Sequence, residues 1–257
     1  MMTAPGGIAL HSALVWTLFA LAPLTFIGLL RLKVPYGRHY SGRRWGPGLP
    51  DRVGWIVMEL PAPIFFAWVY FAGPSAGGAV PLVFLGIWQC HYLNRTFIYP
   101  LRTRTRGKRM PAVVAVSGFA FNIVNAYINA RWVSEIGRYD PQWLGDPRFL
   151  AGLSVFAAGF ALNLHSDNTL LKLRKPGETG YSIPRGGGFR YVSCPNYLGE
   201  VMEWAGWALA TWSLAGLAFF LFTAANLVPR ALSHHRWYRE RFEDYPPGRK
   251  AIIPGWI

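Results

Sequence analysis

Long apolar runs separated by short polar segments dominate the chain. The runs recur along the whole length, and a helix needs about 20 such residues to cross a bilayer. The region between Glu203 and Arg230 carries no charge and is too long for one helix, so we expect a tight turn near residues 213–216. The pattern predicts an all-α polytopic membrane protein, a seven-transmembrane helix bundle with spans at approximately 8–30, 53–72, 78–100, 111–131, 148–165, 197–212 and 215–233.

The charges between the spans support this count. The loops after the first, third and fifth spans and the C-terminal tail are rich in Lys and Arg, whereas the other connections are neutral or mixed. Basic loops face the cytoplasm. We therefore expect an N-terminus outside and a cytoplasmic C-terminus, and a six-span arrangement would break the alternation.

Composition narrows the class further. The 257 residues are 52% hydrophobic and 15% charged, with a net charge of +14. Because the basic residues lie between apolar spans, they indicate topogenic charge and contact with anionic lipid rather than nucleic acid. The N-terminus has no basic leader or obvious cleavage site, so we expect the first run to be a mature span. The two cysteines give no disulfide framework, and no repeat divides the chain, so residues 1–257 are expected to form a single membrane domain.

Two spans carry ionisable groups at membrane depth, where they are costly. Glu59 lies between apolar residues, and Pro61 should kink or loosen the same helix. Structural pairing with a neighbouring Arg or His is the alternative to a functional Glu59. In the third span Tyr92 and Arg95 can share a helical face, as can His91 and Arg95. A snorkelling Arg95 and an interfacial Tyr92 are the alternatives.

Polar residues also recur at helical spacing near the cytoplasmic ends of three other helices. The segment NLHSDNTLLKLRKPGE begins inside an apolar run. The mixture of donors and acceptors, with several arginines, suits a large polar ligand that carries phosphates. These stripes comprise Asn163, Asp167 and Arg174; Asn196, Glu200 and Glu203; and Arg230, His234 and Tyr238.

Other patterns are less specific. Asn122, Asn125 and Asn129 form one polar face of the fourth span, which favours helix–helix hydrogen bonding over a cavity lining. The Pro- and Gly-rich segment 175–195 could be a flap over a ligand or a flexible linker. No GxGxxG follows a strand, so a dinucleotide would have to be held between helices. No HxxxH or paired CxxC is present, and we do not expect a metal site.

The segment NLHSDNTLLKLRKPGETGYSIPRGGGFRYVSCPNYLGEVMEW, with the tail HHRWYRERFEDYPPGRKAIIPGWI, resembles the steroid 5α-reductase family. The segments MELPAP, CHYLNRTFIYPL and YGRH match the same family, so the resemblance extends from about residue 33 to the C-terminus. It implies a seven-helix bundle that binds NADPH in its cytoplasmic half and reduces the Δ4 double bond of 3-oxo-Δ4-steroids.

The resemblance also implies roles for individual residues. Glu59 and Tyr92 would contact the 3-oxo group, and Trp55, Met58 and Tyr197 would bind the steroid. Spans one to four would form the substrate half, to which Tyr197 would add from the sixth span. Met58 stands where vertebrate members carry glutamine, which leaves the preferred steroid open. The cofactor half would begin at about residue 148, and Arg95 would join it from the third span. The residues implied to bind the cofactor are Arg95, Asn163, Asp167, Arg174, Tyr181, Asn196, Glu200, Arg230, His234 and Tyr238.

The residue types fit this chemistry. Hydride addition to an enone builds negative charge on the carbonyl oxygen, which fixed donors in a dry site stabilise. A phenol such as Tyr92 can donate, and so can a buried carboxylic acid such as Glu59 if it stays protonated. We expect both to bind the oxygen, the cofactor to supply hydride to C5, and C4 to take a proton. The steroid would enter from the bilayer and the anionic cofactor from the cytoplasm.

Alternative functions remain at this point. FRYVSCPNYLGE also resembles a wider superfamily that includes isoprenylcysteine carboxyl methyltransferases and sterol C14/C7 reductases. An S-adenosylmethionine enzyme would not need a deep Glu–Tyr pair, and the NLHSD, RKPGE and FEDYP segments favour the 5α-reductases. Reduction of a 2,3-enoyl thioester is a close alternative. A lipid-binding or transport bundle would not explain three polar stripes. No obligate protein partner is implied.

Overall fold

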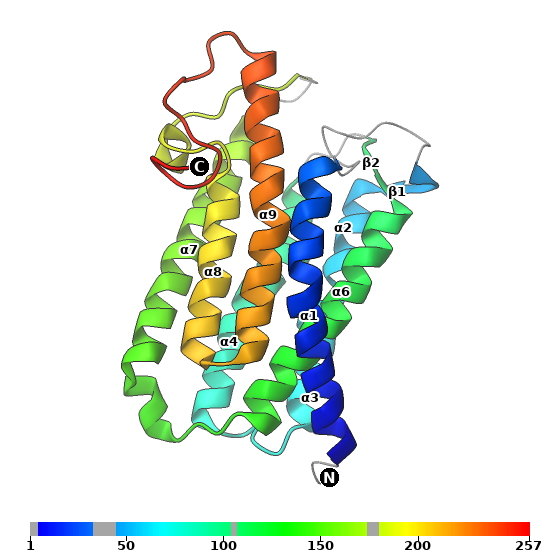
Figure 1. Cartoon of the computed structure of the whole chain (residues 1–257), viewed down its shortest axis with the longest axis vertical. Helices are drawn as coiled ribbons and strands as arrows, with labels where there is room; N and C mark the ends of the chain where they lie inside the picture. Colours follow the sequence, from blue (N-terminus) through cyan, green and yellow to red (C-terminus); the bar gives the residue numbers. More distant parts are fainter. Residues whose placement is uncertain (1–4, 33–44, 104–106, 174–179) are drawn as a thin grey trace.

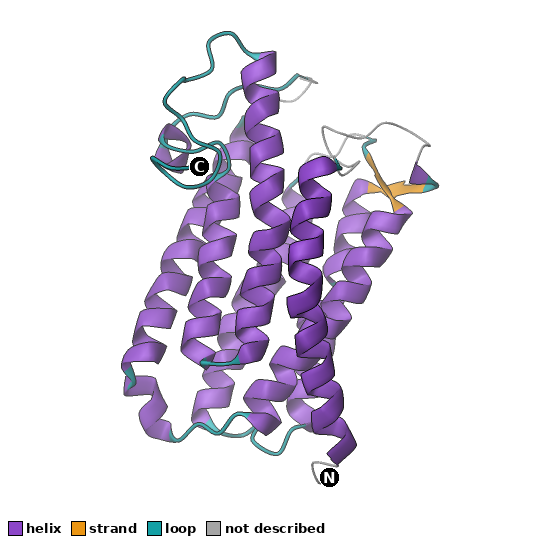
Figure 2. Cartoon of the chain, viewed as in Figure 1, coloured by secondary structure: helices purple, strands orange, loops and turns teal. Residues whose placement is uncertain are grey.

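The computed structural model describes residues 5–32, 45–103, 107–173 and 180–257, which are mostly helical. Figures 1 and 2 show helices running along one long axis, joined by loops at both ends. The α-helices are α1 (Pro5–Arg31), α2 (Asp51–Glu59), α3 (Pro61–Ala72), α4 (Ala79–Leu93), α5 (Tyr99–Arg102), α6 (Ala112–Arg131), α7 (Pro147–Lys172), α8 (Pro195–Thr211) and α9 (Leu214–Arg241). Shorter turns are the π-helical segments Asn94–Ile98 and Trp132–Ile136 and the 3-10 segments Pro141–Gly145 and Gly187–Arg190.

Within the described ranges, five helical segments are long and apolar enough to cross a membrane. They are Gly7–Arg31, Asp51–Ala72, Ala112–Ile136, Pro147–Lys172 and Leu214–Arg241. The other two expected spans correspond to α4 and α8, which also run through the bundle (Figure 1). Helix α8 has 17 residues and includes Glu200 and Glu203, and α4 has 15 residues before it widens into a π-helical turn. The count of seven membrane crossings therefore stays a prediction.

Two local features follow the sequence expectations. Helix α2 ends at Glu59 and α3 begins at Pro61, while Leu60 keeps helical angles (φ −54°, ψ −38°), so the chain continues in a helical path. The turn expected near residue 213 lies between α8 and α9. There Trp212 is left-handed (φ 45°), and the Ser213 hydroxyl accepts a hydrogen bond from the Gly216 amide at 2.9 Å. A serine in this position caps the new helix.

A small antiparallel sheet accompanies the helices of this mostly helical chain, and the sequence did not predict it. Strand β1 (Gly48–Pro50) pairs with β2 (Arg109–Pro111), with Leu49 opposite Met110. The pairing joins the loops that follow the first and third spans, so both lie at the same end of the bundle, as the charge pattern requires. The C-terminus lies at this end and the N-terminus at the other (Figure 1). Two three-residue strands carry too little alternation to be recognised in sequence.

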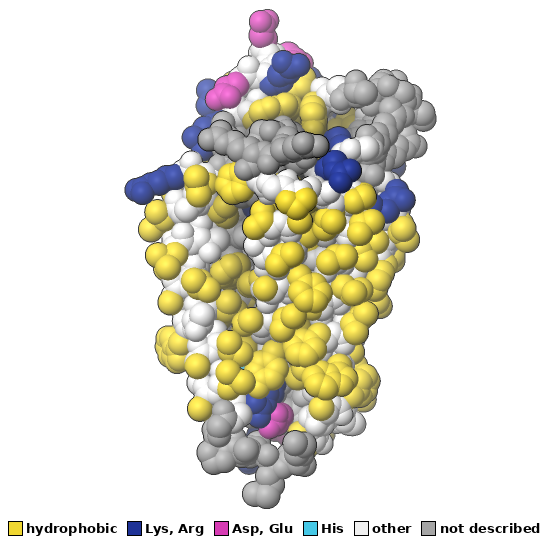
Figure 3. Space-filling view, turned by 90° about the vertical axis from the view of Figure 1, so that its right-hand side faces the viewer, with side chains coloured by type: hydrophobic (Ala, Val, Ile, Leu, Met, Phe, Trp, Pro, Cys, Tyr) yellow, Lys and Arg dark blue, Asp and Glu magenta, His cyan; other side chains and the backbone are white. Residues whose placement is uncertain are grey.

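The outer surface is apolar over most of the bundle's height. Figure 3 shows hydrophobic side chains covering the middle of one face. Lys and Arg gather mainly toward the end of the bundle that holds the small sheet and the C-terminus, which we call the loop end. Trp16, Leu24, Ile64, Trp68 and Phe71 are among the large hydrophobic residues that are exposed. An apolar surface of this extent fits lipid contact.

An aromatic core fills the centre of the bundle. Phe66 stacks on Trp88 with ring centroids 4.3 Å apart, and Trp88 lies 5.4 Å from Trp204 and 5.2 Å from Trp207. These side chains come from α3, α4 and α8 and are almost fully buried. The core therefore fixes α4 against α8, and both helices carry candidate site residues.

Glycines let α7 and α8 approach closely. A Cβ atom on Gly159 would lie 2.5 Å from the Gly199 carbonyl oxygen, and one on Gly206 would lie 2.5 Å from the Gly152 carbonyl oxygen. No side chain can move aside there, because the opposing atoms are backbone. Small residues at such crossings are typical of membrane helix pairs. Asn163 and Asp167 on α7 are thereby held against Asn196 and Glu200 on α8.

We predict that Gly206→Ala lowers the free energy of unfolding by about 1–3 kcal/mol, because the added methyl group forces the two backbones apart. Thermal unfolding in detergent measures the effect. Gly86→Ala on α4 is the matched control, since its Cβ would meet nothing within 4 Å. Equal melting temperatures for the two variants would contradict the close α7–α8 packing.

Candidate active site

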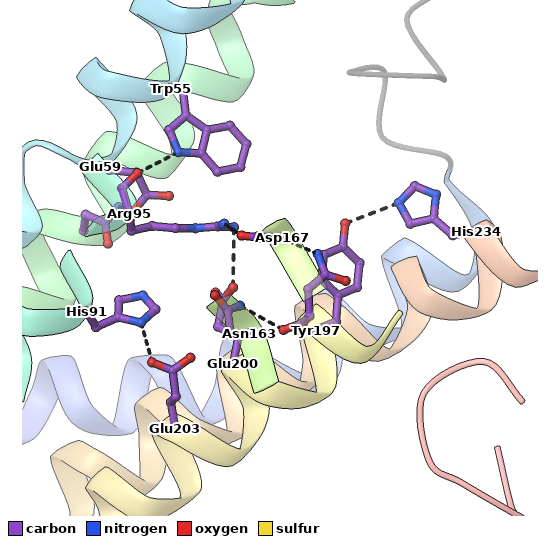
Figure 4. Close-up of polar contacts among 12 residues, drawn as sticks. Trp55, Glu59, His91, Arg95, Asn163, Asp167, Tyr197, Glu200, Glu203 and His234 are labelled. Carbon is purple, nitrogen blue, oxygen red and sulfur yellow. Dashed lines mark hydrogen bonds and ion pairs between the residues drawn. The ribbon is translucent and has the colours of Figure 1, made fainter. Parts of the chain in front are cut away.

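Arg95 joins three helical segments at the centre of the site. It lies in the π-helical turn that follows α4, a type of turn that is frequent at functional sites. Its guanidinium nitrogens lie 3.5 Å from an Asp167 carboxylate oxygen on α7 and 3.4 Å from a Glu200 carboxylate oxygen on α8. All three side chains are at most 16% exposed. Figure 4 shows Arg95 reaching from the Glu59 side of the site to these two acids.

Trp55 covers the other side of Arg95. The guanidinium carbon of Arg95 lies 4.7 Å from the Trp55 ring centroid, and the Trp55 indole N–H donates to the Arg95 carbonyl oxygen at 3.2 Å. The Tyr99 ring also lies beneath the guanidinium at 5.3 Å. Cation–π contacts of this kind orient an arginine as well as stabilising it.

Glu59 is half-buried at the end of α2 and is held from α6. The Asn122 side-chain amide donates to a Glu59 carboxyl oxygen at 3.3 Å and to the Met58 carbonyl oxygen at 2.9 Å. Glu59 also lies within electrostatic range of Arg95 and Glu200. Arg95 therefore lies between Glu59, which is within its electrostatic range, and the acids of α7 and α8 with which it pairs. Met58 lies against α6, where a Cβ atom on Gly118 would collide with its side chain.

Tyr92 is buried in the aromatic core on α4. Its ring lies 4.8 Å from Trp88 and 5.5 Å from Trp204, both measured between centroids, which fixes its position. The hydroxyl is within electrostatic range of Glu59 and Arg95. Glu59 and Tyr92 come from different helices, yet the fold places them in one neighbourhood.

The polar stripes of α7 and α8 meet each other. The Asn163 amide donates to the Asn196 carbonyl oxygen at 2.9 Å, and the Asn196 amide donates to Asp167 at 3.3 Å. Figure 4 shows Asn163, Asp167 and Glu200 grouped on the far side of Arg95 from Glu59. The structure therefore brings together residues that the helical spacing predicted as separate stripes.

A buried His–Glu pair lies below this group. The His91 Nδ1 atom is 2.6 Å from a Glu203 carboxylate oxygen, and both side chains are almost completely buried. His91 packs at the edge of the Tyr92 ring, 4.9 Å between centroids. The sequence indicated both residues as polar groups at membrane depth, but nothing in it predicted a pairing across 112 positions. The contact between Asn122 and Glu59 was missed for the same reason.

The remaining predicted residues that the structure describes lie toward the end of the bundle that holds the C-terminus. Tyr197 contacts His234, with its hydroxyl 3.3 Å from Nε2, and Figure 4 shows both away from Glu59. Tyr197 is thus placed with residues predicted for the cofactor rather than beside Glu59. Tyr181 packs against Trp237 at 5.1 Å between ring centroids. The other three are Arg230 and Tyr238, both on α9, and Arg174, which lies outside the described residues.

Comparison with known proteins identifies the family. Residues 108–257 match the family model described as 3-oxo-5-alpha-steroid 4-dehydrogenase. The chain belongs to this family. Its relatives include steroid 5-alpha-reductase DET2 of Solanum lycopersicum, 45% identical over 249 residues that cover 95% of this chain and 96% of the relative.

Animal relatives also align over most of the chain. The 3-oxo-5-alpha-steroid 4-dehydrogenase 1 of Rattus norvegicus is 42% identical over 249 residues, covering 96% of this chain and 95% of that protein. The Homo sapiens protein of the same name is 43% identical over 222 residues, 85% of each chain. The family resemblance read from the NLHSD, RKPGE and FEDYP segments is therefore confirmed, and these matches favour the reductase over the methyltransferase alternative.

We predict that Arg95→Gln lowers the free energy of unfolding by about 3 kcal/mol, because it leaves Asp167 and Glu200 buried without their cation. Denaturation of ligand-free protein in detergent measures this change. Arg185→Gln is the matched control. Arg185 also pairs with a carboxylate, Asp244 at 3.1 Å, but both groups are about two-thirds exposed, so we expect a change of about 0.5 kcal/mol or less. Equal small losses would show that Arg95 does not hold the helices together.

Proposed function

We propose that this chain reduces the Δ4 double bond of a 3-oxo-Δ4-steroid with NADPH, and that Glu59 and Tyr92 bind the 3-oxo group. Membership of the 3-oxo-5-alpha-steroid 4-dehydrogenase family supports the reaction class and a nicotinamide cofactor. The observation that carries the proposal is that Glu59 and Tyr92 lie within electrostatic range of Arg95, which pairs with acids of α7 and α8. In this proposal the residues that bind the steroid oxygen therefore lie next to the polar residues of α7 and α8 that bind the nucleotide.

The residues around Arg95 fit a nicotinamide nucleotide. Sugar hydroxyls and the nicotinamide carboxamide need buried hydrogen-bond partners. One Glu200 carboxylate oxygen is buried and, within the described residues, makes no hydrogen bond, although it lies 3.4 Å from a guanidinium nitrogen of Arg95. Asp167 and Asn163 add an acid and an amide beside it. In this proposal the nucleotide is held by Arg95, Asn163, Asp167, Asn196 and Glu200, and farther along by Tyr181, Arg230, His234 and Tyr238. Arg174, which lies outside the described residues, is proposed for the same site from the family resemblance.

The charge of the loop end supports NADPH in particular. Lys and Arg gather there (Figure 3), and the whole chain has a net charge of +14. A nucleotide with an additional phosphate gains more from such a surface than one without it. When bound, the cofactor supplies the hydride for C5 of the steroid.

The chain's own residues handle the oxygen. As C5 is reduced, electrons of the double bond shift toward the 3-oxo group, and C4 takes a proton. Tyr92 and a protonated Glu59 donate hydrogen bonds to the oxygen as its charge builds. The Asn122 amide holds Glu59 in place, and Trp55, packed on Arg95, offers a flat face for the steroid rings. Apolar surroundings exclude water and strengthen these interactions.

One assay separates this reaction from the alternatives. We expect the purified protein in detergent or lipid to consume NADPH with progesterone or testosterone and to release a 5α-reduced product. An enoyl-thioester reductase would instead consume NADPH only with a 2,3-enoyl thioester. Tight binding of S-adenosylmethionine without NADPH turnover would favour the methyltransferase and overturn the proposal.

Removing the donors should slow the reaction. We predict that Tyr92→Phe and Glu59→Leu each lower kcat with progesterone by about 100-fold, because each deletes a hydrogen bond to the developing charge. Glu59→Gln should lose less, since its amide can still donate. Initial rates of NADPH oxidation measure these changes.

The controls change a tyrosine and a glutamate elsewhere in the chain. Tyr70→Phe deletes a hydroxyl that donates to the Ala76 carbonyl oxygen at 2.7 Å, and Glu135→Gln alters the partner of Arg131. Neither side chain contacts the Arg95 group, so both variants should keep wild-type kcat. If Tyr92→Phe and Glu59→Leu also keep it while binding NADPH normally, the proposed oxygen-binding pair is wrong.

A further inference from the structure

A series of hydrogen bonds runs along α6 from Asn129 to Asn125, which lies near Tyr92. It starts at Trp207 on α8, whose indole N–H donates to the Asn129 side-chain oxygen at 2.8 Å. An indole nitrogen can only donate. The atom that receives this bond must therefore be the amide oxygen, and the amide NH2 of Asn129 must point the other way.

The next bond fixes a second asparagine. The Asn129 NH2 group donates to both the backbone and the side-chain oxygen of Asn125, each at 3.0 Å. With its oxygen used in this way, Asn125 is left with its NH2 group directed away from Asn129. This NH2 group is buried and, within the described residues, has no hydrogen-bond partner. A buried amide donor without a partner costs about 1–3 kcal/mol of folding stability. Such a cost suggests that the donor has a function.

The side chain of Asn125 interacts with the Tyr92 hydroxyl, although the contact does not have the geometry of an ordinary hydrogen bond. Catalytic hydrogen bonds are often long without substrate and shorten when it binds. Because Trp207 sets both amides, Asn125 presents a donor to the phenol oxygen and not an acceptor.

We propose that Asn125, oriented by Asn129 and Trp207, is a positioning residue that donates to the Tyr92 hydroxyl oxygen and thereby turns the phenolic hydrogen toward the substrate oxygen. This inference rests on the proposed function, in which Tyr92 binds the 3-oxo group. A phenol has one hydrogen. If Asn125 presented its oxygen instead, that hydrogen would be drawn to Asn125 and lost to the substrate.

The donor has a second effect during the reaction. As the Tyr92 hydrogen shifts toward the charged substrate oxygen, negative charge grows on the phenol oxygen. A donor already aimed at that oxygen stabilises this charge, and hydrogen bonds in series strengthen one another. Asn125 therefore acts mainly in the transition state, so its loss should lower kcat and kcat/KM together and leave the KM for progesterone nearly unchanged.

A double-mutant cycle tests the inference. We expect Asn125→Leu, which keeps the volume but removes the donor, to lower kcat about tenfold in the wild-type background. In the Tyr92→Phe background the same substitution should change kcat less than twofold, since there is no hydroxyl left to position. Wild-type NADPH binding and melting temperature show that each variant is folded.

Trp207→Phe supplies an independent variant that leaves Asn125 in place. Without the indole N–H, the two amides can rotate, so we expect a loss of about threefold to tenfold that also disappears in the Tyr92→Phe background. Trp143→Phe is the matched control. Its indole N–H donates to the Ala210 carbonyl oxygen at 3.0 Å, outside this series of hydrogen bonds, so kcat should stay at the wild-type value.

The outcomes are distinct. Unchanged kcat in Asn125→Leu, or in Trp207→Phe if Asn125→Leu does not fold, overturns the positioning role while the proposed function stands. An equal loss in both backgrounds also overturns it, because Asn125 would then act independently of Tyr92. If Tyr92→Phe alone keeps wild-type kcat, the proposed oxygen-binding pair is wrong and this inference falls with it.

Discussion

The site depends on one buried ion-pair arrangement, Arg95 between Asp167 and Glu200. Three charges at membrane depth are stable only if their partners remain in place, because each uncompensated charge would cost several kcal/mol. The arrangement therefore requires α7, α8 and the turn after α4 to stay in register. The glycine contacts between α7 and α8 and the π-helical turn at Arg95 satisfy this requirement.

Around Arg95 the bundle separates two environments. On one side, Trp55, Glu59 and Tyr92 form a region bordered by aromatic and apolar side chains, suited to a flat hydrophobic molecule with one oxygen. On the other, α7 and α8 present acids and amides, suited to a nucleotide. Arg95 contacts both, through the Trp55 ring and through its two acids. A reaction between a steroid and a nicotinamide needs such a boundary.

Much of this could be predicted from sequence, for identifiable reasons. Helical spacing revealed the polar stripes that contain Asp167 and Glu200, because residues three or four apart share a face whatever surrounds the helix. The turn at Ser213 followed from length and charge alone. The partners of these residues could not be predicted in the same way. Pairing of His91 with Glu203, or of Asn122 with Glu59, depends on how each helix is rotated and how closely it packs, which the core aromatics and glycines decide together. The roles of individual residues came from family resemblance and stay predictions, including the steroid contact of Tyr197, whose hydroxyl lies beside His234.

A structure of the protein with NADP⁺ and progesterone bound together tests the central claim most directly. The account predicts that the nicotinamide ring lies beside Arg95 between Asp167 and Glu200 on one side and the steroid on the other. It also predicts that the 3-oxo oxygen lies within hydrogen-bond distance of both Glu59 and Tyr92. A nucleotide bound away from α7 and α8, or a steroid whose 3-oxo group points away from Glu59 and Tyr92, would contradict it.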